Sequence, residues 1–192
     1  MQIDEKIIEK IVQEVLKNIK VSESKKDEGP KASTLVSQDG IFSDYQAALK
    51  AAAEAQKKLA LMGLDKREEL VSSMRKAVVA NAEKLARMAF EETKMGRYEH
   101  KIAKNINSAL RTPGTEDLKT EAITGDDGLL LIERGPFGLT VAITPSTNPT
   151  ATIINGSIGL IAAGNSVFFC PHPGAYKSSL ETIRILNRAI RE

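Results

Sequence analysis

The sequence predicts an α/β fold in which several helices come first and a parallel strand–helix–strand unit follows. Residues 43–112 carry helix signals and no strand pattern. Two short runs rich in β-branched and aromatic residues, LTVAIT at 139–144 and NSVFFC at 165–170, lie farther along the chain. The apolar segment 150–163 between them has the length of a crossover helix, so the two strands should be parallel and the crossover right-handed.

The composition excludes several classes of protein. The 27 Lys and Arg residues nearly balance the 25 Asp and Glu residues and are interspersed with them, which argues against nucleic acid as the main partner. No apolar run approaches the roughly 20 residues of a membrane helix, and acidic side chains near the start are not typical of a secretory signal. The single cysteine excludes an internal disulfide and fits a reducing cytoplasm, and no metal-site spacing is present.

Residues 1–19 predict an amphipathic helix, and residues 20–40, which are polar and lack periodicity, predict a flexible linker. A helix of this length is marginal alone in water, so its apolar stripe needs a partner surface. The pattern leaves two alternatives open: the helix folds back on its own domain, or it docks onto another protein. The apolar residues at helical spacing are Ile3, Ile7, Ile8, Ile11, Val12, Val15, Leu16 and Ile19.

The folded part of the chain begins near residue 41. Ser43 with Gln46 forms a capping box, which predicts a helix that continues to about Met62. Gly63 follows and should end this first helix.

Three more helices are predicted from similar signals. Asp65 with Glu68 repeats the capping pattern for the second helix. Asn81 is placed to cap the third, which Gly96 closes. Residues 97–111 form the fourth helix, which stops before a Pro-Gly pair, so four helices precede any strand.

The pattern then changes to strands. Residues 128–138 predict a strand that ends in a turn, before the two parallel strands, and Gly164 should end the helix between those two. Neither parallel strand alternates between apolar and polar residues, which is typical of strands buried on both faces. A last helix over 176–192 should cover the same sheet.

Polar residues and prolines follow both parallel strands at their carboxyl ends, where ligands collect in open α/β sheets. The first turn runs from Thr144 through Pro145, Ser146 and Thr147 to Asn148. It leads into a helix N-terminus, where free backbone N–H groups favour an anion or a developing negative charge. The alternative is that these side chains are ordinary helix caps.

The second turn comprises Cys170, Pro171, His172 and Pro173, and it should open into the same crevice as the first. Neither a G-x-G-x-x-G motif nor a Walker loop is present, so the two standard nucleotide fingerprints are missing. The residues by themselves therefore indicate an α/β crevice with a polar rim.

Four stretches of the sequence carry a resemblance to a known family. They are EETKMGR, TPGTEDL, ITPSTNPT and the combination of AAGNSVFF with PHPGA, and they span roughly residues 42–177. Together they resemble the CoA-acylating aldehyde dehydrogenases of bacterial microcompartments, which act on propionaldehyde or acetaldehyde. The resemblance implies the N-terminal part of the aldehyde dehydrogenase fold, with a Rossmann-like cofactor domain that lacks the glycine fingerprint.

The resemblance also implies a reaction and a set of partners. An aldehyde, CoA and NAD give acyl-CoA and NADH: a cysteine thiolate forms a thiohemiacetal, hydride passes to the nicotinamide, and CoA takes the acyl group. In the family this cysteine lies later in the chain. We therefore expect residues 41–192 to be a truncated NAD- and CoA-binding domain that is inactive alone and belongs to a homo-oligomer at full length.

Residues 1–19 resemble the encapsulation peptides that dock such enzymes onto shell proteins. This resemblance implies a cytoplasmic protein inside a microcompartment. The alternative function is a non-catalytic module that only docks onto the shell. The strand that ends at Cys170 would be an uncovered apolar edge in a fragment, so we expect the isolated chain to be poorly soluble or to depend on a partner.

The resemblance assigns roles to the two turns. In the family the first turn lies along the nicotinamide, and an asparagine in it donates to the thiohemiacetal oxygen. An ungapped match places that asparagine at Thr147, with Asn148 one step later, so both remain candidates. The second turn corresponds to the segment that holds the adenosine ribose, where hydrolytic relatives have a lysine at the position of Cys170.

The remaining chemically active side chains have simpler interpretations. Cys170 closes a buried strand and precedes a proline, so we expect it to be a strand-end or pocket-lining residue and not the nucleophile. His172 either contacts the cofactor or forms a plain surface turn. His100 lies within a charged helix and should have no other role.

Overall fold

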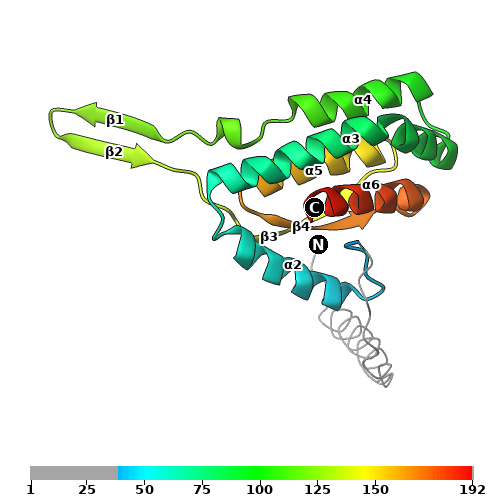
Figure 1. Cartoon of the computed structure of the whole chain (residues 1–192), viewed down its shortest axis with the longest axis horizontal. Coiled ribbons are helices and arrows are strands. Elements are labelled where there is room, and N and C mark those ends of the chain that lie inside the picture. Colours follow the sequence, from blue (N-terminus) through cyan, green and yellow to red (C-terminus); the bar gives the residue numbers. More distant parts are fainter. Residues whose placement is uncertain (1–38, 192) are drawn as a thin grey trace, which may run out of the picture. The chain divides into compact units, whose positions relative to one another are not determined.

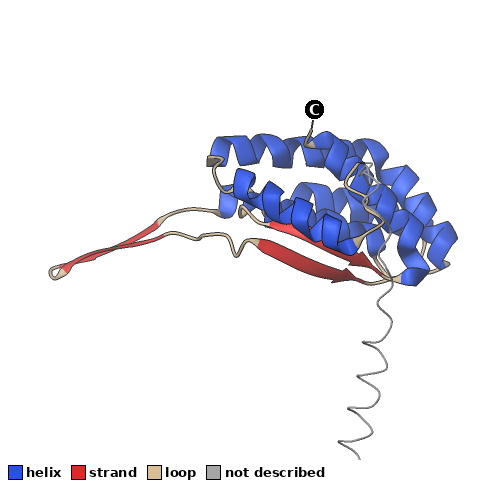
Figure 2. Cartoon of the chain, turned by 90° about the horizontal axis from the view of Figure 1, so that it is seen from below, coloured by secondary structure: helices blue, strands red, loops and turns tan. Residues whose placement is uncertain are grey.

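The structure is a computed structural model that describes residues 39–191 of the chain. The amphipathic helix expected over 1–19 and nearly all of the linker expected over 20–40 lie outside the described residues. Figure 1 shows the described part with its elements labelled, and Figure 2 shows it turned by 90°.

Helices come first and strands later, as predicted. The elements in chain order are α2 (Tyr45–Leu59), α3 (Leu64–Thr93), α4 (Tyr98–Arg111), the short helix η1 (Thr115–Asp117), β1 (Glu121–Gly125), β2 (Gly128–Ile132), β3 (Leu139–Thr144), α5 (Pro149–Ala162), β4 (Ser166–Pro171), η2 (Pro173–Ala175) and α6 (Tyr176–Ala189).

The first helix begins one residue later than its capping signal. Asp44 is the N-cap of α2, and its carboxylate accepts a hydrogen bond from the Ala47 N–H at 2.8 Å. The prediction of Ser43 as the cap was therefore wrong by one position, because the adjacent carboxylate makes the bond. Gly63 does not terminate this helix either, since α2 ends at Leu59 and Gly63 is the N-cap residue of α3.

The predicted break at Asn81 is absent, because α3 is one continuous helix of 30 residues. The Asn81 side chain donates to the carbonyl oxygen of Ala77, one turn back, at 2.8 Å and caps nothing. Lys94, in the left-handed conformation, closes the helix. Within residues 39–191, three α-helices and not four thus precede the first strand, because burial of one long stripe overrides the local capping signal. That buried stripe is Val71, Met74, Val78, Ala82, Leu85, Ala86 and Ala89.

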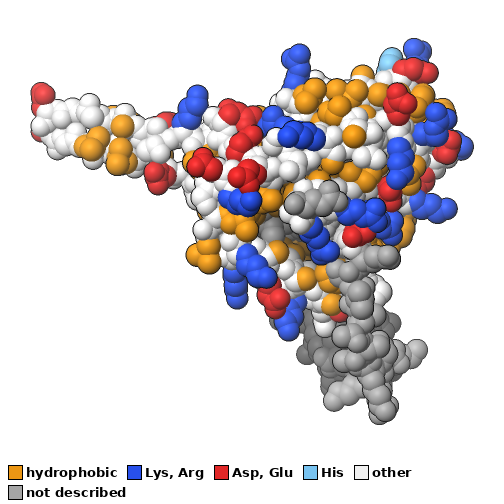
Figure 3. All heavy atoms as spheres, in the orientation of Figure 1, with side chains coloured by type: hydrophobic (Ala, Val, Ile, Leu, Met, Phe, Trp, Pro, Cys, Tyr) orange, Lys and Arg blue, Asp and Glu red, His pale blue; other side chains and the backbone are white. Residues whose placement is uncertain are grey.

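A β-hairpin stands where a single strand was predicted. β1 pairs antiparallel with β2, from Glu121 opposite Ile132 to Gly125 opposite Gly128. Every residue of both strands is exposed, and apolar side chains of the hairpin are visible at the surface in Figure 3. The sequence of β1 is short and has no apolar run, which is why the pattern missed it.

The predicted strand–helix–strand unit is confirmed. β3 and β4 are parallel and in register from Leu139 opposite Ser166 to Thr144 opposite Pro171. α5 connects them, and the left-handed backbone of Gly164 follows its last turn. The guanidinium of Arg67 on α3 donates to the carbonyl oxygen of Ala162 at 2.9 Å, which satisfies one of the free carbonyl groups at the end of α5.

The exposed apolar strand is β3 and not β4. α2 packs against β4, whose residues are buried or half-buried. On β3, by contrast, Val141 is exposed and Ile143 is 86% exposed. The expectation that both strands are buried on both faces is therefore wrong for β3. The strand that ends at Cys170 is an edge, as predicted, because the sheet has two strands, but its side chains are covered.

The apolar core forms where α5 packs against α3 and α6. Its fully buried isoleucines, Ile153, Ile154 and Ile158, each contribute about 1.5–3 kcal/mol by leaving water. Phe169 of β4 packs against the same cluster. The core therefore fixes the position of α5, and with it the two turns that flank the strands.

The N-terminus of α6 is capped from another helix. The carboxylate of Glu92 on α3 accepts hydrogen bonds from the backbone N–H groups of Lys177 at 2.7 Å and Ser178 at 2.8 Å, and from the Ser178 hydroxyl at 2.7 Å. Burial by itself would raise the pKa of Glu92, but these hydrogen bonds outweigh it and hold the pKa below its ordinary value of 4.5.

Glu92→Gln should therefore destabilise the chain by about 1–2 kcal/mol at pH 7, as expected for loss of a helix cap. Because the pKa of Glu92 is lower in the folded state, its contribution is complete above the unfolded value of 4.5 and is lost as pH falls through the lowered value. Urea unfolding at pH 7 and near pH 3 measures both effects. The matched control is Glu91→Gln at the exposed neighbour, and equal losses for the two variants would contradict the cap.

Candidate functional site

The two predicted turns lie side by side at one end of the parallel strand pair. Thr144 pairs with Pro171 in the strand register, and the His172 N–H donates to the Thr144 carbonyl oxygen at 3.2 Å. The turns continue from these paired positions, so the geometric prediction that they share one rim is confirmed.

The residues of the first turn differ in burial. Thr144 is 2% exposed, and its hydroxyl has no hydrogen-bond partner among the described residues. Pro145 and Thr147 are exposed, while Ser146 and Asn148 are half-buried. A buried hydroxyl without a partner is uncommon in proteins, and here it stands at the base of the turn.

The second turn presents a histidine to solvent. The Nδ1 atom of the exposed His172 accepts a hydrogen bond from the Gly174 N–H at 3.0 Å, so Nε2 is left for other contacts. Cys170 is a free, half-buried thiol that pairs with Ile143 on the neighbouring strand. Cys170 lies at the end of β4, as expected, and it lines neither of the two cavities described below. Pro173 is the first residue of the short helix η2.

Asn148 occupies the N-cap position of α5, but its side chain makes no cap hydrogen bond. Its Oδ1 atom instead accepts a hydrogen bond from the ammonium group of Lys104 on α4 at 3.0 Å. The interpretation of Asn148 as an ordinary cap is therefore wrong. The first-turn N–H groups of α5 have no side-chain cap, which leaves the helix N-terminus available to a negative charge.

A second lysine holds the same turn by its backbone. Lys101, one helical turn before Lys104, is 6% exposed, and its ammonium group donates to the Thr147 carbonyl oxygen at 3.3 Å. Its pKa lies below the ordinary value because burial disfavours the charged form, and the positive charge of Lys104 adds to this. The sequence analysis missed both lysines. The two lysines are spaced i, i+3 on the predicted fourth helix, which the sequence shows. Their partners lie more than 40 residues away, so the sequence does not show the contacts.

A buried amide ties the helices around this turn together. Asn105 on α4 donates from Nδ2 to the Ala82 carbonyl oxygen of α3 at 3.2 Å. Its Oδ1 atom accepts a hydrogen bond from the hydroxyl of Thr150, the second residue of α5, at 2.7 Å. α3, α4 and the start of α5 are thus joined through one side chain.

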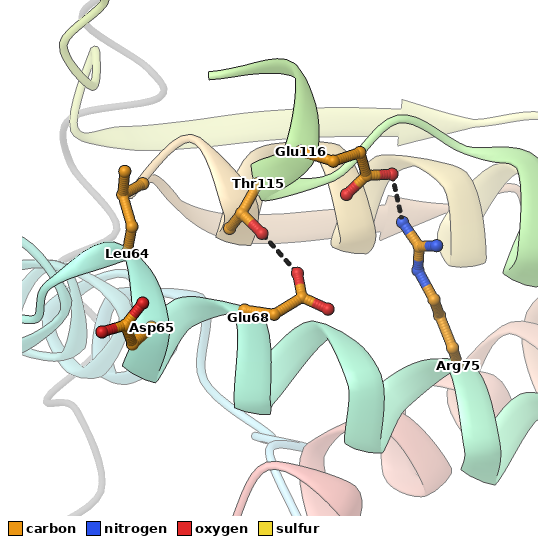
Figure 4. Close-up of a pocket in the computed structure, with 6 residues that line it drawn as sticks. All are labelled: Leu64, Asp65, Glu68, Arg75, Thr115 and Glu116. Atoms are coloured by element: carbon orange, nitrogen blue, oxygen red, sulfur yellow. Dashed lines mark hydrogen bonds and ion pairs between the residues drawn. The ribbon is translucent and has the colours of Figure 1, made fainter. Parts of the chain in front are cut away.

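One cavity of the described part lies away from the two turns, and another reaches the second turn. A polar one of about 540 Å³ lies between the start of α3 and η1, where Thr115 donates to Glu68 and Arg75 pairs with Glu116 at 3.0 Å (Figure 4). Its charged groups are largely paired with one another, and it includes none of the predicted site residues. The second, of about 690 Å³, is bordered by α2, β4 and α6 and extends to Pro171.

Residues 39–191 lack two further features that would indicate a function. No group of three or more His, Cys, Asp or Glu side chains there is arranged to hold a metal ion. None of the helices in that range is long and apolar enough to span a membrane.

Comparison with known proteins places these elements in context. Residues 30–190 match the aldehyde dehydrogenase family. The chain is 44% identical over 200 residues to the acetaldehyde dehydrogenase (acetylating) of Bilophila wadsworthia, and the match covers all of this chain and 40% of that protein. The chain thus spans well under half of the length of this relative.

Two solved structures have the same fold. One is a propionaldehyde dehydrogenase from the fucose utilisation microcompartment of Clostridium phytofermentans (TM-score 0.76, 51% identity, 78% of this chain and 34% of that one). The other is the Rhodopseudomonas palustris propionaldehyde dehydrogenase with bound CoA and an acylated cysteine (TM-score 0.78, 49% identity, 81% of this chain and 36% of that one). The predicted fold class, the N-terminal part of the aldehyde dehydrogenase fold, is confirmed.

The Asn105 link should matter for stability. Asn105→Ala leaves the buried Thr150 hydroxyl without its acceptor and removes the link to the Ala82 carbonyl, so we expect a loss of roughly 2–3 kcal/mol in the free energy of unfolding. Asn107→Ala changes an exposed residue of the same helix and serves as the control. Chemical denaturation of both variants measures the difference, and similar midpoints would contradict the role of Asn105.

Proposed function

This chain belongs to the aldehyde dehydrogenase family, and from that premise we propose that it is the cofactor-binding portion of a CoA-acylating aldehyde dehydrogenase. The substrate would be a short-chain aldehyde, and the product acyl-CoA. The names of the relatives support this proposal, since they are acetylating or propionaldehyde enzymes, and one of them has been solved with bound CoA. The geometric support is the junction of the two turns, which pair at Thr144 and Pro171 beside the uncapped start of α5.

The proposed reaction proceeds through a thioester. A cysteine thiolate adds to the aldehyde carbon, so that a C–S bond forms and the carbonyl oxygen becomes an oxyanion. NAD, when bound, would supply the acceptor for the hydride of that carbon, and the C=O bond would reform as a thioester. The thiolate of CoA attacks the thioester, an acyl–S bond to CoA forms, and the enzyme thiolate leaves. Cys170, at the end of β4, is not proposed as this nucleophile.

The first turn would stabilise the oxyanion. The N–H groups at the start of α5, with the positive charges of Lys101 and Lys104 close by, favour negative charge there. A side-chain donor from Thr147 or Asn148 would complete the site. The unpartnered, buried Thr144 hydroxyl at the base of the turn is a further group that a bound molecule could satisfy.

The second turn would hold the ribose of NAD or CoA. The Nε2 atom of His172 is left for a ribose hydroxyl because Nδ1 accepts from Gly174. Cys170 stands where hydrolytic relatives have a lysine, and a cysteine lacks the charge and length of that clamp. A weaker ribose clamp suits a site that NAD must leave before CoA enters.

We also propose the cellular setting. The whole enzyme would be a homo-oligomer in the cytoplasm, enclosed in a bacterial microcompartment, as supported by the relative from a fucose utilisation microcompartment. Residues 1–19 would act as the encapsulation peptide, because their apolar stripe needs a partner surface.

Cofactor binding by the two turns is testable in this chain. In an ¹⁵N-labelled sample, NADH and CoA should each shift the backbone amide signals of the non-proline residues of the two turns, which are Thr144, Ser146, Thr147, Asn148, Cys170 and His172. His172→Ala should weaken binding about fivefold, the worth of one hydrogen bond, whereas His100→Ala on the exposed face of α4 should not. With propionaldehyde, CoA and NAD, the chain alone should give no turnover. Shifts confined to the cavity around Glu68 would contradict the site.

Shell docking by residues 1–19 is tested by capture on an immobilised microcompartment shell protein. Ile11→Glu places a charge in the apolar stripe and should abolish capture, whereas Gln13→Glu adds the same charge on the polar face and should leave it intact. Equal capture of both variants, or of a chain without residues 1–19, would rule out this function. That result would leave the enzymatic proposal standing.

A further inference from the structure

We propose that Lys104 is a positioning residue, which orients the side-chain amide of Asn148 so that its Nδ2 group donates to the oxyanion of the reaction. This inference rests on the proposed function and names the donor that the sequence left open between Thr147 and Asn148. It also assigns a role to a lysine that lies outside both turns.

The chemistry of the contact fixes the direction of the amide. The Lys104 Nζ atom lies 3.0 Å from Oδ1 of Asn148. An ammonium group has three donors and no acceptor, so only the oxygen of the amide can face it. The two N–H bonds of Nδ2 must then point away from Lys104. Without such a partner, an amide can turn over and present its oxygen to the reacting group.

Lys101 holds the adjacent backbone in place. It donates to the Thr147 carbonyl oxygen at 3.3 Å, so two lysines one turn apart on α4 hold the main chain and the side chain of consecutive residues. α4 is itself fixed to α3 and α5 through Asn105. The turn is therefore held by a helix that does not contribute to the turn itself.

This arrangement favours Asn148 over Thr147 as the donor. The Thr147 side chain is exposed, and its hydroxyl is free to rotate about the Cβ–O bond. The Asn148 side chain is half-buried and held at its oxygen. Oxyanion stabilisation depends on donors that are oriented before the charge develops, and Asn148 meets that condition.

The positive charges add to the argument. No carboxylate of residues 39–191 forms an ion pair with Lys101 or Lys104, and Lys101 is 6% exposed. Burial of an ammonium group with one carbonyl partner is costly, and two cations beside a helix N-terminus repel its dipole. The positive charges of Lys101 and Lys104 therefore destabilise the empty site. A negative charge that develops there during the reaction would compensate them.

The test uses the complete enzyme that carries this chain and measures NADH formation in the first turnover. Asn148→Ala should slow this step about 100-fold, as loss of one oxyanion donor does. Lys104→Met should slow it about tenfold, with little change in the KM for the aldehyde. Lys104→Arg and Lys104→Gln keep a donor and should recover most of the rate. Lys76→Met, at an exposed lysine of α3, is the matched control.

The double variant separates positioning from an independent effect. If Lys104 acts through Asn148, then Lys104→Met should not slow the enzyme further in the Asn148→Ala background. The Asn148 side-chain NH₂ signal of the ¹⁵N-labelled chain should also move in Lys104→Met and not in Lys76→Met. A full tenfold loss in both backgrounds, or an unmoved NH₂ signal, overturns the positioning role. A normal rate for Asn148→Ala overturns the oxyanion assignment within the proposed function instead.

Discussion

Burial of α5 is the constraint on which the rest of the described structure depends. This helix is apolar on nearly every side, so it must be enclosed by the strands on one side and by α3 and α6 on another. Its start is then placed at the carboxyl end of β3, and its end leads into β4. The two polar turns lie together because burial of α5 fixes its position relative to β3 and β4.

Polar contacts hold the ends of the buried helices in the positions that apolar packing gives them. Arg67 holds the end of α5, Asn105 holds its second residue, and Glu92 holds the start of α6. Each of these side chains comes from α3 or α4, so the first helices of the chain act as a frame for the later strand–helix–strand unit. The frame also contributes to chemistry, because Lys101 and Lys104 contact the first turn from the same side.

The strand–helix–strand unit and its two turns were predictable because their signals are local. The β-branched runs, the apolar helix between them and the prolines can be recognised without knowing their neighbours. The break predicted at Asn81 is absent, because the local preference of asparagine for a cap position is overridden by the burial of Leu85 and Ala86 beyond it. β1 left no apolar pattern since both faces of the hairpin are exposed. The hydrogen bond from Lys104 to Asn148 joins residues that are 44 positions apart, and no spacing in the sequence predicts such a contact.

The uninterrupted course of α3 has a mechanical consequence. A helix of 30 residues is about 45 Å long, and it touches the end of α5 near its own beginning and the start of α6 near its finish. Because the helix is continuous between these points, its length sets the distance between the two contacts. Movement of the end of α5 away from the start of α6 would therefore have to break one of these two contacts with α3.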